Sequence, residues 1–99
     1  MLPLELYDEA LAEMAGAIEY YDEQREGLGT QFREAVEAAI NTIQERPLSY
    51  PVIARSNVRR VLTNRFPFAI IYRVESDMIV VVSVFHTSRN PIIWKGRIG

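Results

Sequence analysis

The sequence predicts an α+β fold in which a helical hairpin packs on a mostly antiparallel four-stranded sheet, in the order βααβββ. Two long segments with apolar residues at helical spacing come first, and three segments rich in β-branched and aromatic residues follow them. The chain has 99 residues, which is the size of one domain. Residues 1–99 are therefore expected to form a single domain around one small core.

The first elements are a short strand and a helix. Residues 2–7 carry leucines at alternate positions, which is typical of a short strand. Asp8 is predicted to cap the helix that follows, and this helix is expected to end at Gly27. Its apolar face recurs at steps of three and four residues: Leu11, Met14, Ile18 and Tyr21. Tyr20 lies off this face and is expected to be exposed.

A second helix is predicted from Leu28 to the residue before Pro47, which stops it. Its apolar face contains Leu28, Phe32, Val36, Ile40 and Ile43. Because the turn around Gly27 and Gly29 is short, the two helices are expected to run antiparallel as a hairpin. Neither helix can bury its apolar face alone, so both are expected to pack on the sheet.

The rest of the chain predicts a loop, three strands and a tail. Residues 47–57 are expected to form a loop, since two prolines interrupt them. Strands are predicted over Val58–Leu62, Phe66–Val74 and Met78–Phe85. The third strand is apolar on both of its faces, so it is expected to be covered on both sides. Residues 92–97 form an amphipathic tail that is expected to pack through Trp94.

The amino-acid composition limits the classes of function that the chain can have. The chain contains no cysteine, which excludes disulfides and thiolate chemistry, and only one histidine, so no metal site and no cofactor are expected. No signal peptide is recognised, and the longest apolar run is far shorter than the roughly 20 residues that span a bilayer. The protein is therefore expected to be cytoplasmic and to have no membrane partner.

The charges are divided between the two halves of the chain. Residues 1–46 carry eleven acids against three arginines, and residues 47–99 carry two acids against seven arginines and one lysine. A basic half suits an anionic partner, whether a nucleic acid or an acidic peptide. The alternative is that the division of charge has a structural origin, because helices favour glutamate on solvated faces and strands favour arginine there.

Several spaced motifs resemble the RelE/ParE superfamily of toxins from bacterial type II toxin–antitoxin systems. The resemblance covers nearly the whole chain. It rests on residues 20–24 (YYDEQ), residues 27–29 (GLG), Phe32, Pro47, Tyr50-Pro51, Arg60, residues 66–68 (FPF), Ile71-Tyr72, residues 84–91 (VFHTSRNP), Trp94 and Arg97. It implies a cognate antitoxin whose disordered C-terminal segment folds over the toxin, so a hetero-oligomer with the antitoxin is expected. Members of this superfamily arrest growth and stabilise plasmids or chromosomal regions.

The superfamily contains two kinds of toxin. ParE-like members poison DNA gyrase, and RelE-like members cut mRNA in the ribosome with several lysines and arginines and a late tyrosine. Lys95 is the only lysine here, no tyrosine follows Tyr72, and the isoelectric point is about 5.4. The long helical hairpin also resembles the ParE side. We therefore favour a gyrase-directed toxin that acts by binding and has no catalytic residue.

Candidate site residues follow from these two interpretations. The expected antitoxin- or target-binding residues are Arg59, Arg60, Arg89, Trp94, Lys95 and Arg97. Under the alternative, a metal-free endoribonuclease that acts on ribosome-bound mRNA, the acid/base would be His86, and Arg60, Arg73 and Arg89 would neutralise phosphate. The structural alternatives are a hydrogen-bonded His86 at a strand end and a buried Trp94. A third possibility is a binding module that keeps the toxin fold without toxicity.

Overall fold

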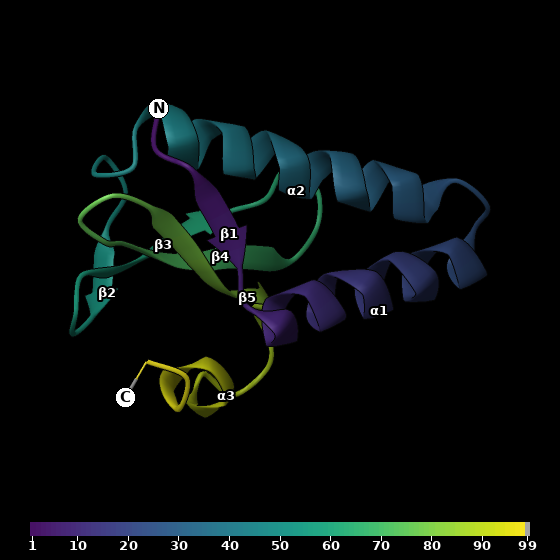
Figure 1. Ribbon diagram of the computed structural model, residues 1–99. Coiled ribbons are helices and arrows are strands. Elements are labelled where there is room, and N and C mark those ends of the chain that lie inside the picture. Colours follow the sequence, from purple (N-terminus) through teal and green to yellow (C-terminus); the bar gives the residue numbers. More distant parts are fainter. Residues whose placement is uncertain (99) are drawn as a thin grey trace.

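A computed structural model describes residues 1–98, which fold into five strands and three helices. Figure 1 shows three layers: the helical hairpin, the sheet, and a short C-terminal helix on the opposite side of the sheet. In chain order the elements are β1 (Leu4–Leu6), α1 (Asp8–Gln24), α2 (Leu28–Glu45), β2 (Val52–Ala54), β3 (Val58–Leu62), β4 (Phe68–Val74), β5 (Ile79–His86) and α3 (Ile92–Lys95). The α+β class and the hairpin are as predicted. Over the described residues, no helix combines the length and apolar composition that crossing a membrane requires.

The sheet has one strand more than the four predicted. Its strand order over residues 1–98 is β1-β5-β4-β3-β2. The additional strand, β2, lies inside the predicted loop 47–57 and pairs antiparallel with β3, where Val52 is opposite Arg59. Ser56 and Asn57 adopt φ angles of 63° and 55°, which lets the chain reverse tightly between the two strands. A three-residue strand between a proline and such a turn has no periodicity to detect, so the sequence did not reveal it.

The central strands follow the prediction, with later starts. β4 begins at Phe68 and not at Phe66, because Pro67 has no N–H for the ladder and Arg65 has a φ of 71°. β5 is buried from Ile79 to Phe85, which confirms that it is covered on both faces. β1 runs parallel to β5, whereas the other pairings are antiparallel.

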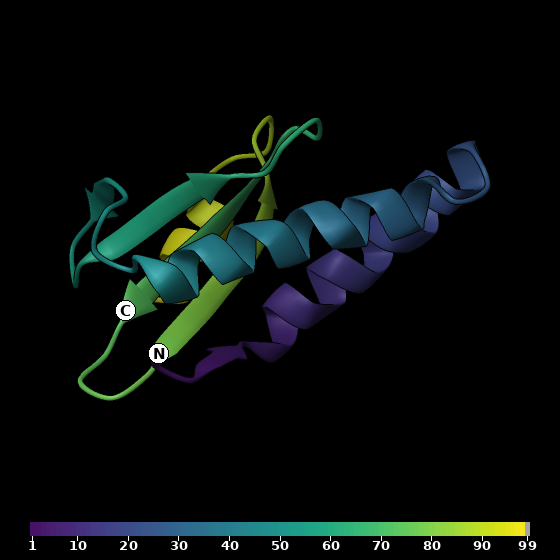
Figure 2. The same cartoon turned by 90° about the horizontal axis from the view of Figure 1, so that it is seen from above.

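The helical hairpin covers one face of the sheet, as Figures 1 and 2 show from two directions. The core on this side, here called the helix-side core, includes Phe32, Val36, Ile43, Ile70 and Tyr72. The chain turns between the helices through Gly27, whose φ is 86°. The residues that α1 contributes to this core are Ala10, Met14, Ala17, Ile18 and Tyr21.

Two predictions about α1 were wrong. Leu11 is 50% exposed, because the buried face of α1 passes through the small residues Ala10 and Ala17, which allow a closer approach to the sheet. Asp8 is the first helical residue and Tyr7 is the N-cap, with no side-chain capping bond. The Asp8 carboxylate still lies in the first turn, where the helix dipole favours it.

The other face of the sheet is covered by the C-terminal segment. Here Trp94 of α3 packs in a buried cluster with Val58, Ala69, Ile71, Val82 and Phe85, which we call the outer core. The predicted tail is therefore a short helix, and its tryptophan is a core residue that is 4% exposed.

Tyr72 links the sheet to the loop after α2, and it makes the fold sensitive to alkali. Its hydroxyl donates a hydrogen bond of 2.6 Å to the Pro47 carbonyl, and burial raises the pKa of Tyr72 to about 12. A folded-state pKa above the unfolded value of about 10 gives stability that is complete below pH 10 and lost as the pH rises towards 12. We expect about 2–3 kcal/mol of unfolding free energy to disappear across that range.

Urea titrations at pH 8, 10 and 11.5 would measure this loss, with Tyr72→Phe as the matched variant. At pH 8 Tyr72→Phe should be about 1 kcal/mol less stable than the parent, because the bond to Pro47 is missing. Its further loss between pH 10 and 11.5 should be clearly smaller than that of the parent. Equal losses in both proteins would show that another group titrates.

Candidate functional site

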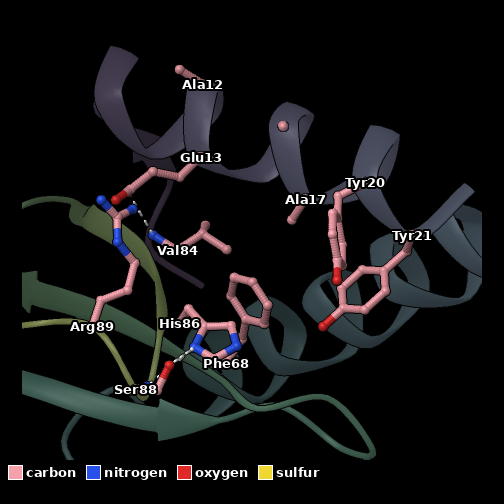
Figure 3. A pocket seen from close by; sticks show the side chains of 11 residues that line it. Ala12, Glu13, Ala17, Tyr20, Tyr21, Phe68, Val84, His86, Ser88 and Arg89 are labelled. Atoms are coloured by element: carbon pink, nitrogen blue, oxygen red, sulfur yellow. Dashed lines mark hydrogen bonds between the residues drawn. The ribbon is translucent and has the colours of Figure 1, made fainter. Parts of the chain in front are cut away.

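An open groove of about 670 Å³ lies between α1 and the second half of β5 (Figure 3). Phe68 and Val84 form part of its apolar surface. Gly16 and Ala17 of α1 line the opposite side, where their small size leaves the groove open. His86, predicted as a candidate acid/base, lines the groove together with polar residues of the segment that follows β5. The groove is therefore an apolar hollow with polar groups on one side.

The groove exists because β1 ends before β5 does. β1 pairs only with Ile79–Val81, and the chain then turns away into α1. β5 continues to His86, so its edge beyond Val81 has no neighbouring strand within residues 1–98. An unpaired edge exposes backbone N–H and C=O groups, which natural proteins cover or cap.

An ion pair between Glu13 and Arg97 caps part of this edge. The Arg97 guanidinium donates to the Glu13 carboxylate at 2.9 and 3.2 Å, and the two side chains are only 14–15% exposed. Glu13 also accepts hydrogen bonds from the Ser83 hydroxyl at 2.9 Å and the Val84 N–H at 3.2 Å. Arg97 further donates to the Val82 carbonyl at 3.1 Å. The pair thus ties α1, β5 and the C-terminal segment together.

His86 is held in one tautomer by its neighbour Ser88. Its Nδ1 accepts from the Ser88 backbone N–H at 3.1 Å and lies 2.8 Å from the Ser88 hydroxyl (Figure 3). Because a backbone N–H can only donate, Nδ1 must be the acceptor, and the ring proton of the neutral imidazole is on Nε2. The ring also contacts Phe68 edge-on, with centroids 5.1 Å apart. In this state His86 is a hydrogen-bond donor whose basic nitrogen is already engaged.

Three of the predicted binding residues are exposed cations: Arg60, Arg89 and Lys95. Within residues 1–98, none of the three takes part in an ion pair. Lys95 lies over the Trp94 ring, with Nζ 5.9 Å from the ring centroid. Arg89 follows β5 and lines the groove, whereas Arg60 lies on β3.

Arg59 has a structural position. Its guanidinium donates to the carbonyl of Tyr50 at 2.7 Å and to that of Leu48 at 3.2 Å, so it holds the loop after α2 against β3. Arg97 and the buried Trp94 are likewise engaged inside the fold. These side chains are not displayed on a free surface.

Arg73 is engaged as well. It donates to the Tyr7 hydroxyl at 3.0 Å and forms an ion pair of 3.2 Å with Glu75. It lies five residues along β4 from Phe68, which pairs with His86, and that distance is roughly 17 Å at about 3.4 Å per residue.

The structure does not bring the proposed nuclease residues together. His86 faces the groove on the helix side of the sheet. Arg60 is two residues from Val58 of the outer core and adjacent to Val61 of the helix-side core, so its side chain lies on the outer face. Only Arg89 shares the groove with His86. In residues 1–98, no group of three or more His, Asp or Glu side chains is arranged to hold a metal ion.

Glu13 and Ser88 were missed as site residues. Glu13 looks like any acid in the first half of a helix, and its buried role depends on Arg97, which lies 84 residues away. Ser88 had a local signal, since its position two residues after a lone histidine allows a hydrogen bond back to the ring.

Comparison with known proteins places the chain in a family. The family described as "ParE toxin of type II toxin-antitoxin system, parDE" matches residues 4–91, so the chain belongs to the ParE toxin family. Its fold is similar to that of a chain from the chromosomal ParDE toxin–antitoxin system of P. aeruginosa, with a TM-score of 0.66 and 17% identity, over 89% of this chain and 98% of that one. No curated protein sequence matched.

Proposed function

We propose that this chain is the toxin of a type II toxin–antitoxin pair, that it inhibits growth by poisoning DNA gyrase, and that a cognate antitoxin neutralises it. In this function the chain binds and performs no covalent chemistry. Membership of the ParE family supports the toxin role. The P. aeruginosa chain of similar fold is described as part of a ParDE system, which supports an antitoxin partner.

The observation that carries the choice of binding over RNA cleavage is the state of His86. A general base must have a free nitrogen within reach of the proton that it removes. The Nδ1 of His86 already accepts from Ser88, and Nε2 carries the ring proton. Arg60 and Arg73 also lie away from the groove, so of the three proposed arginines only Arg89 could meet a phosphate there.

The division of charge supports a binding role for the outer face. The helical hairpin carries most of the acids, and the exposed cations Arg60 and Lys95 belong to β3 and α3. Such an uneven distribution of charge produces a long-range electrostatic field, which orients a protein as it approaches a charged partner. We infer that the outer face, with Arg60 and Lys95, meets the gyrase–DNA complex.

Purified chain without antitoxin should block supercoiling of relaxed plasmid by gyrase and ATP, and protein-linked cleaved plasmid should accumulate. Gel electrophoresis after protease treatment would measure both products. Arg60→Glu should weaken inhibition several-fold because it reverses an exposed charge on the proposed face. Arg33→Glu makes the same charge change on the exposed side of α2 and serves as the control.

Normal supercoiling at high protein concentration would contradict the gyrase target. The same protein would then be added to a translating extract, with His86→Ala as the variant that tests ribosome-dependent cleavage. Growth that continues when the chain is expressed alone would instead indicate a binding module without toxicity.

The antitoxin is expected to contact the basic second half of the chain. Acidic side chains of a disordered segment that folds on binding would pair with exposed arginines. The double substitution Arg60→Glu, Arg89→Glu should therefore weaken antitoxin binding several-fold in a calorimetric titration. An unchanged dissociation constant would show that the antitoxin binds elsewhere, and Arg33→Glu again controls for the overall charge.

A further inference from the structure

We propose that the chain forms a weak homodimer through the open edge of β3 at Leu62, with the two β3 strands antiparallel and the two α2 helices side by side. The strand order β1-β5-β4-β3-β2 puts this edge on the opposite side of the sheet from the groove beside β5. The inference does not rest on the proposed toxin function, because it concerns only how the chain meets a second copy of itself.

The end of β3 is open because β2 does not reach it. Val52 of β2 is opposite Arg59, and the Arg60 N–H donates to the Pro51 carbonyl at 3.3 Å. Pro51 has no N–H to return, and the residues before it form a turn. β3 continues to Leu62, so its edge beyond Arg60 has no neighbouring strand within residues 1–98.

Leu62 presents both of its backbone groups at this open edge. The Thr63 N–H donates to the Phe68 carbonyl at 2.9 Å, so the backbone of Thr63 faces β4, whereas the Arg60 N–H donates to Pro51 on the other side. Residues alternate along an antiparallel ladder, so the N–H and C=O of Leu62 point away from β4, like those of Arg60. β2 stops short of them, which leaves both groups without a strand neighbour in residues 1–98.

A second copy of Leu62 complements these two groups. Two strands that are related by a two-fold axis perpendicular to the sheet run antiparallel, and the same surface of each copy meets the other. With the axis at Leu62, the two leucines would exchange both of their N–H to C=O bonds, as the residues of a hydrogen-bonded antiparallel pair do. The direction follows from this symmetry, since the free groups alone would also suit a parallel strand.

The side chains that meet at the axis are compatible. Leu62 is 61% exposed, and the leucine of the second copy would cover it. Val61 would lie opposite Thr63, so no like charges are opposed, which would destabilise the pair. Pro51 occupies the edge at Arg60 and limits the new ladder to Val61–Thr63. The backbone contribution is therefore small, and the dimer is expected to be weak.

A second groove runs along this edge, between α2 and the end of β3, with a volume of about 280 Å³. Among residues 1–98, none that lines this groove carries a formal charge. A nucleic acid or an acidic peptide would find no cation in it. The wall that α2 contributes is made of small side chains, Ala35, Ala38 and Thr42, which would let the α2 helix of a second copy approach closely.

The two ends of this second groove carry opposite charges. At one end the exposed Arg65 donates to Oε1 of Gln31, near the start of α2, at 3.0 Å. At the other end is the exposed Glu45, which lies on the same stripe of α2 as Gln31 and Ala38 because the three are seven residues apart. Neither charge takes part in an ion pair within residues 1–98. A two-fold axis exchanges the ends, so Arg65 of each copy would meet Glu45 of the other. This self-complementary charge favours a second copy as the partner.

Sedimentation equilibrium of the full chain should show a monomer–dimer equilibrium between about 10 µM and about 1 mM, since small interfaces bind weakly. Leu62→Lys should stay monomeric throughout, because it puts two like charges at the axis, and lysine is common on exposed strand edges. Leu11→Lys changes another exposed leucine, on α1, and should dimerise like the parent. Circular dichroism would confirm that both variants are folded.

A charge exchange tests the two-fold arrangement. Arg65→Glu should weaken the dimer about ten-fold, because it turns an attraction to Glu45 into a repulsion twice in each dimer. Glu45→Arg should have the same effect. The double variant Arg65→Glu, Glu45→Arg should return to within about three-fold of the parent, as expected for two residues in contact. Arg33→Glu, on the opposite side of α2 from this groove, is the control and should leave the dimer unchanged.

The amide resonance of Leu62 reports on the proposed contact itself. In the ¹⁵N-labelled chain it should move downfield as the concentration rises, because the N–H gains an acceptor, and the amide of His86 at the other edge should stay in place. A chain that is monomeric at the highest concentration would overturn the proposal. A dimer that survives Leu62→Lys, or that the double charge variant fails to restore, would also overturn it. The supercoiling assay tests the proposed function separately from all of these results.

Discussion

Replacing Glu13 by alanine is expected to lower the free energy of unfolding by about 3–5 kcal/mol, because it leaves the Arg97 guanidinium buried without a counter-charge. Two further groups lose their acceptor, the Ser83 hydroxyl and the Val84 N–H. A domain of this size is stable by only about 5–15 kcal/mol, so the variant should be close to unfolding at 37 °C. Urea denaturation followed by circular dichroism would measure the loss.

Two variants distinguish the effect of breaking the buried ion pair from the effect of removing any acidic side chain of α1. Glu9→Ala removes an exposed carboxylate from the same helix and should change stability by no more than about 0.5 kcal/mol. The double variant Glu13→Ala, Arg97→Ala should lose less than the sum of the two single losses, since no charge is left unpaired. A loss below about 1 kcal/mol for Glu13→Ala would contradict the buried ion pair.

The fluorescence of Trp94 reports independently on the ion pair between Glu13 and Arg97. It is the only tryptophan and is buried in the outer core, and Arg97 follows it by three residues. If the pair with Glu13 anchors the C-terminal segment, Glu13→Ala should shift the tryptophan emission to longer wavelength at urea concentrations where α1 and α2 are still helical. Loss of both signals in one transition would show that the segment has no separate stability.

The helices and central strands could be predicted because periodicity is a local property. The apolar face of α2 repeats over several turns, and Phe32, Val36 and Ile43 are indeed fully buried. β2 is too short to repeat, and its pairing depends on a turn through Ser56 and Asn57 in left-handed conformation. The parallel pairing of β1 with β5 likewise brings together residues that are more than 70 positions apart, and no local pattern specifies it.

The candidate site was predictable as a region and not as a set of contacts. The polar residues after β5 were recognised because a buried strand delivers them to an edge, and His86 does line the groove. The arginines were chosen by residue type, yet Arg59 and Arg97 bind groups of the fold itself. Sequence cannot distinguish an arginine that meets a partner from one that meets a distant carbonyl or carboxylate of its own chain.

Gly29→Ala is expected to lower the free energy of unfolding by about 2–4 kcal/mol, although alanine is the better helix former. A Cβ at this position would collide with the Ile18 carbonyl of α1 and lie 2.8 Å from Cγ of Asp22. The Gly29 N–H also donates to the Asp22 carboxylate at 2.7 Å, a bond that joins the two helices. Because the clash involves backbone, the helices must move apart, which strains this bond and loosens the contact around Phe32.

Gly16→Ala is the matched control, since Gly16 is an exposed residue at the open groove and a Cβ there meets nothing within 4 Å. It should raise the free energy of unfolding by about 0.5–1 kcal/mol, through helix propensity alone. Thermal or urea denaturation of the two variants side by side would give opposite signs. A neutral or stabilising Gly29→Ala would mean that the hairpin is more loosely packed at its turn than its contacts indicate. The GLG sequence would then be needed for the left-handed turn at Gly27 and not for the close approach of the helices.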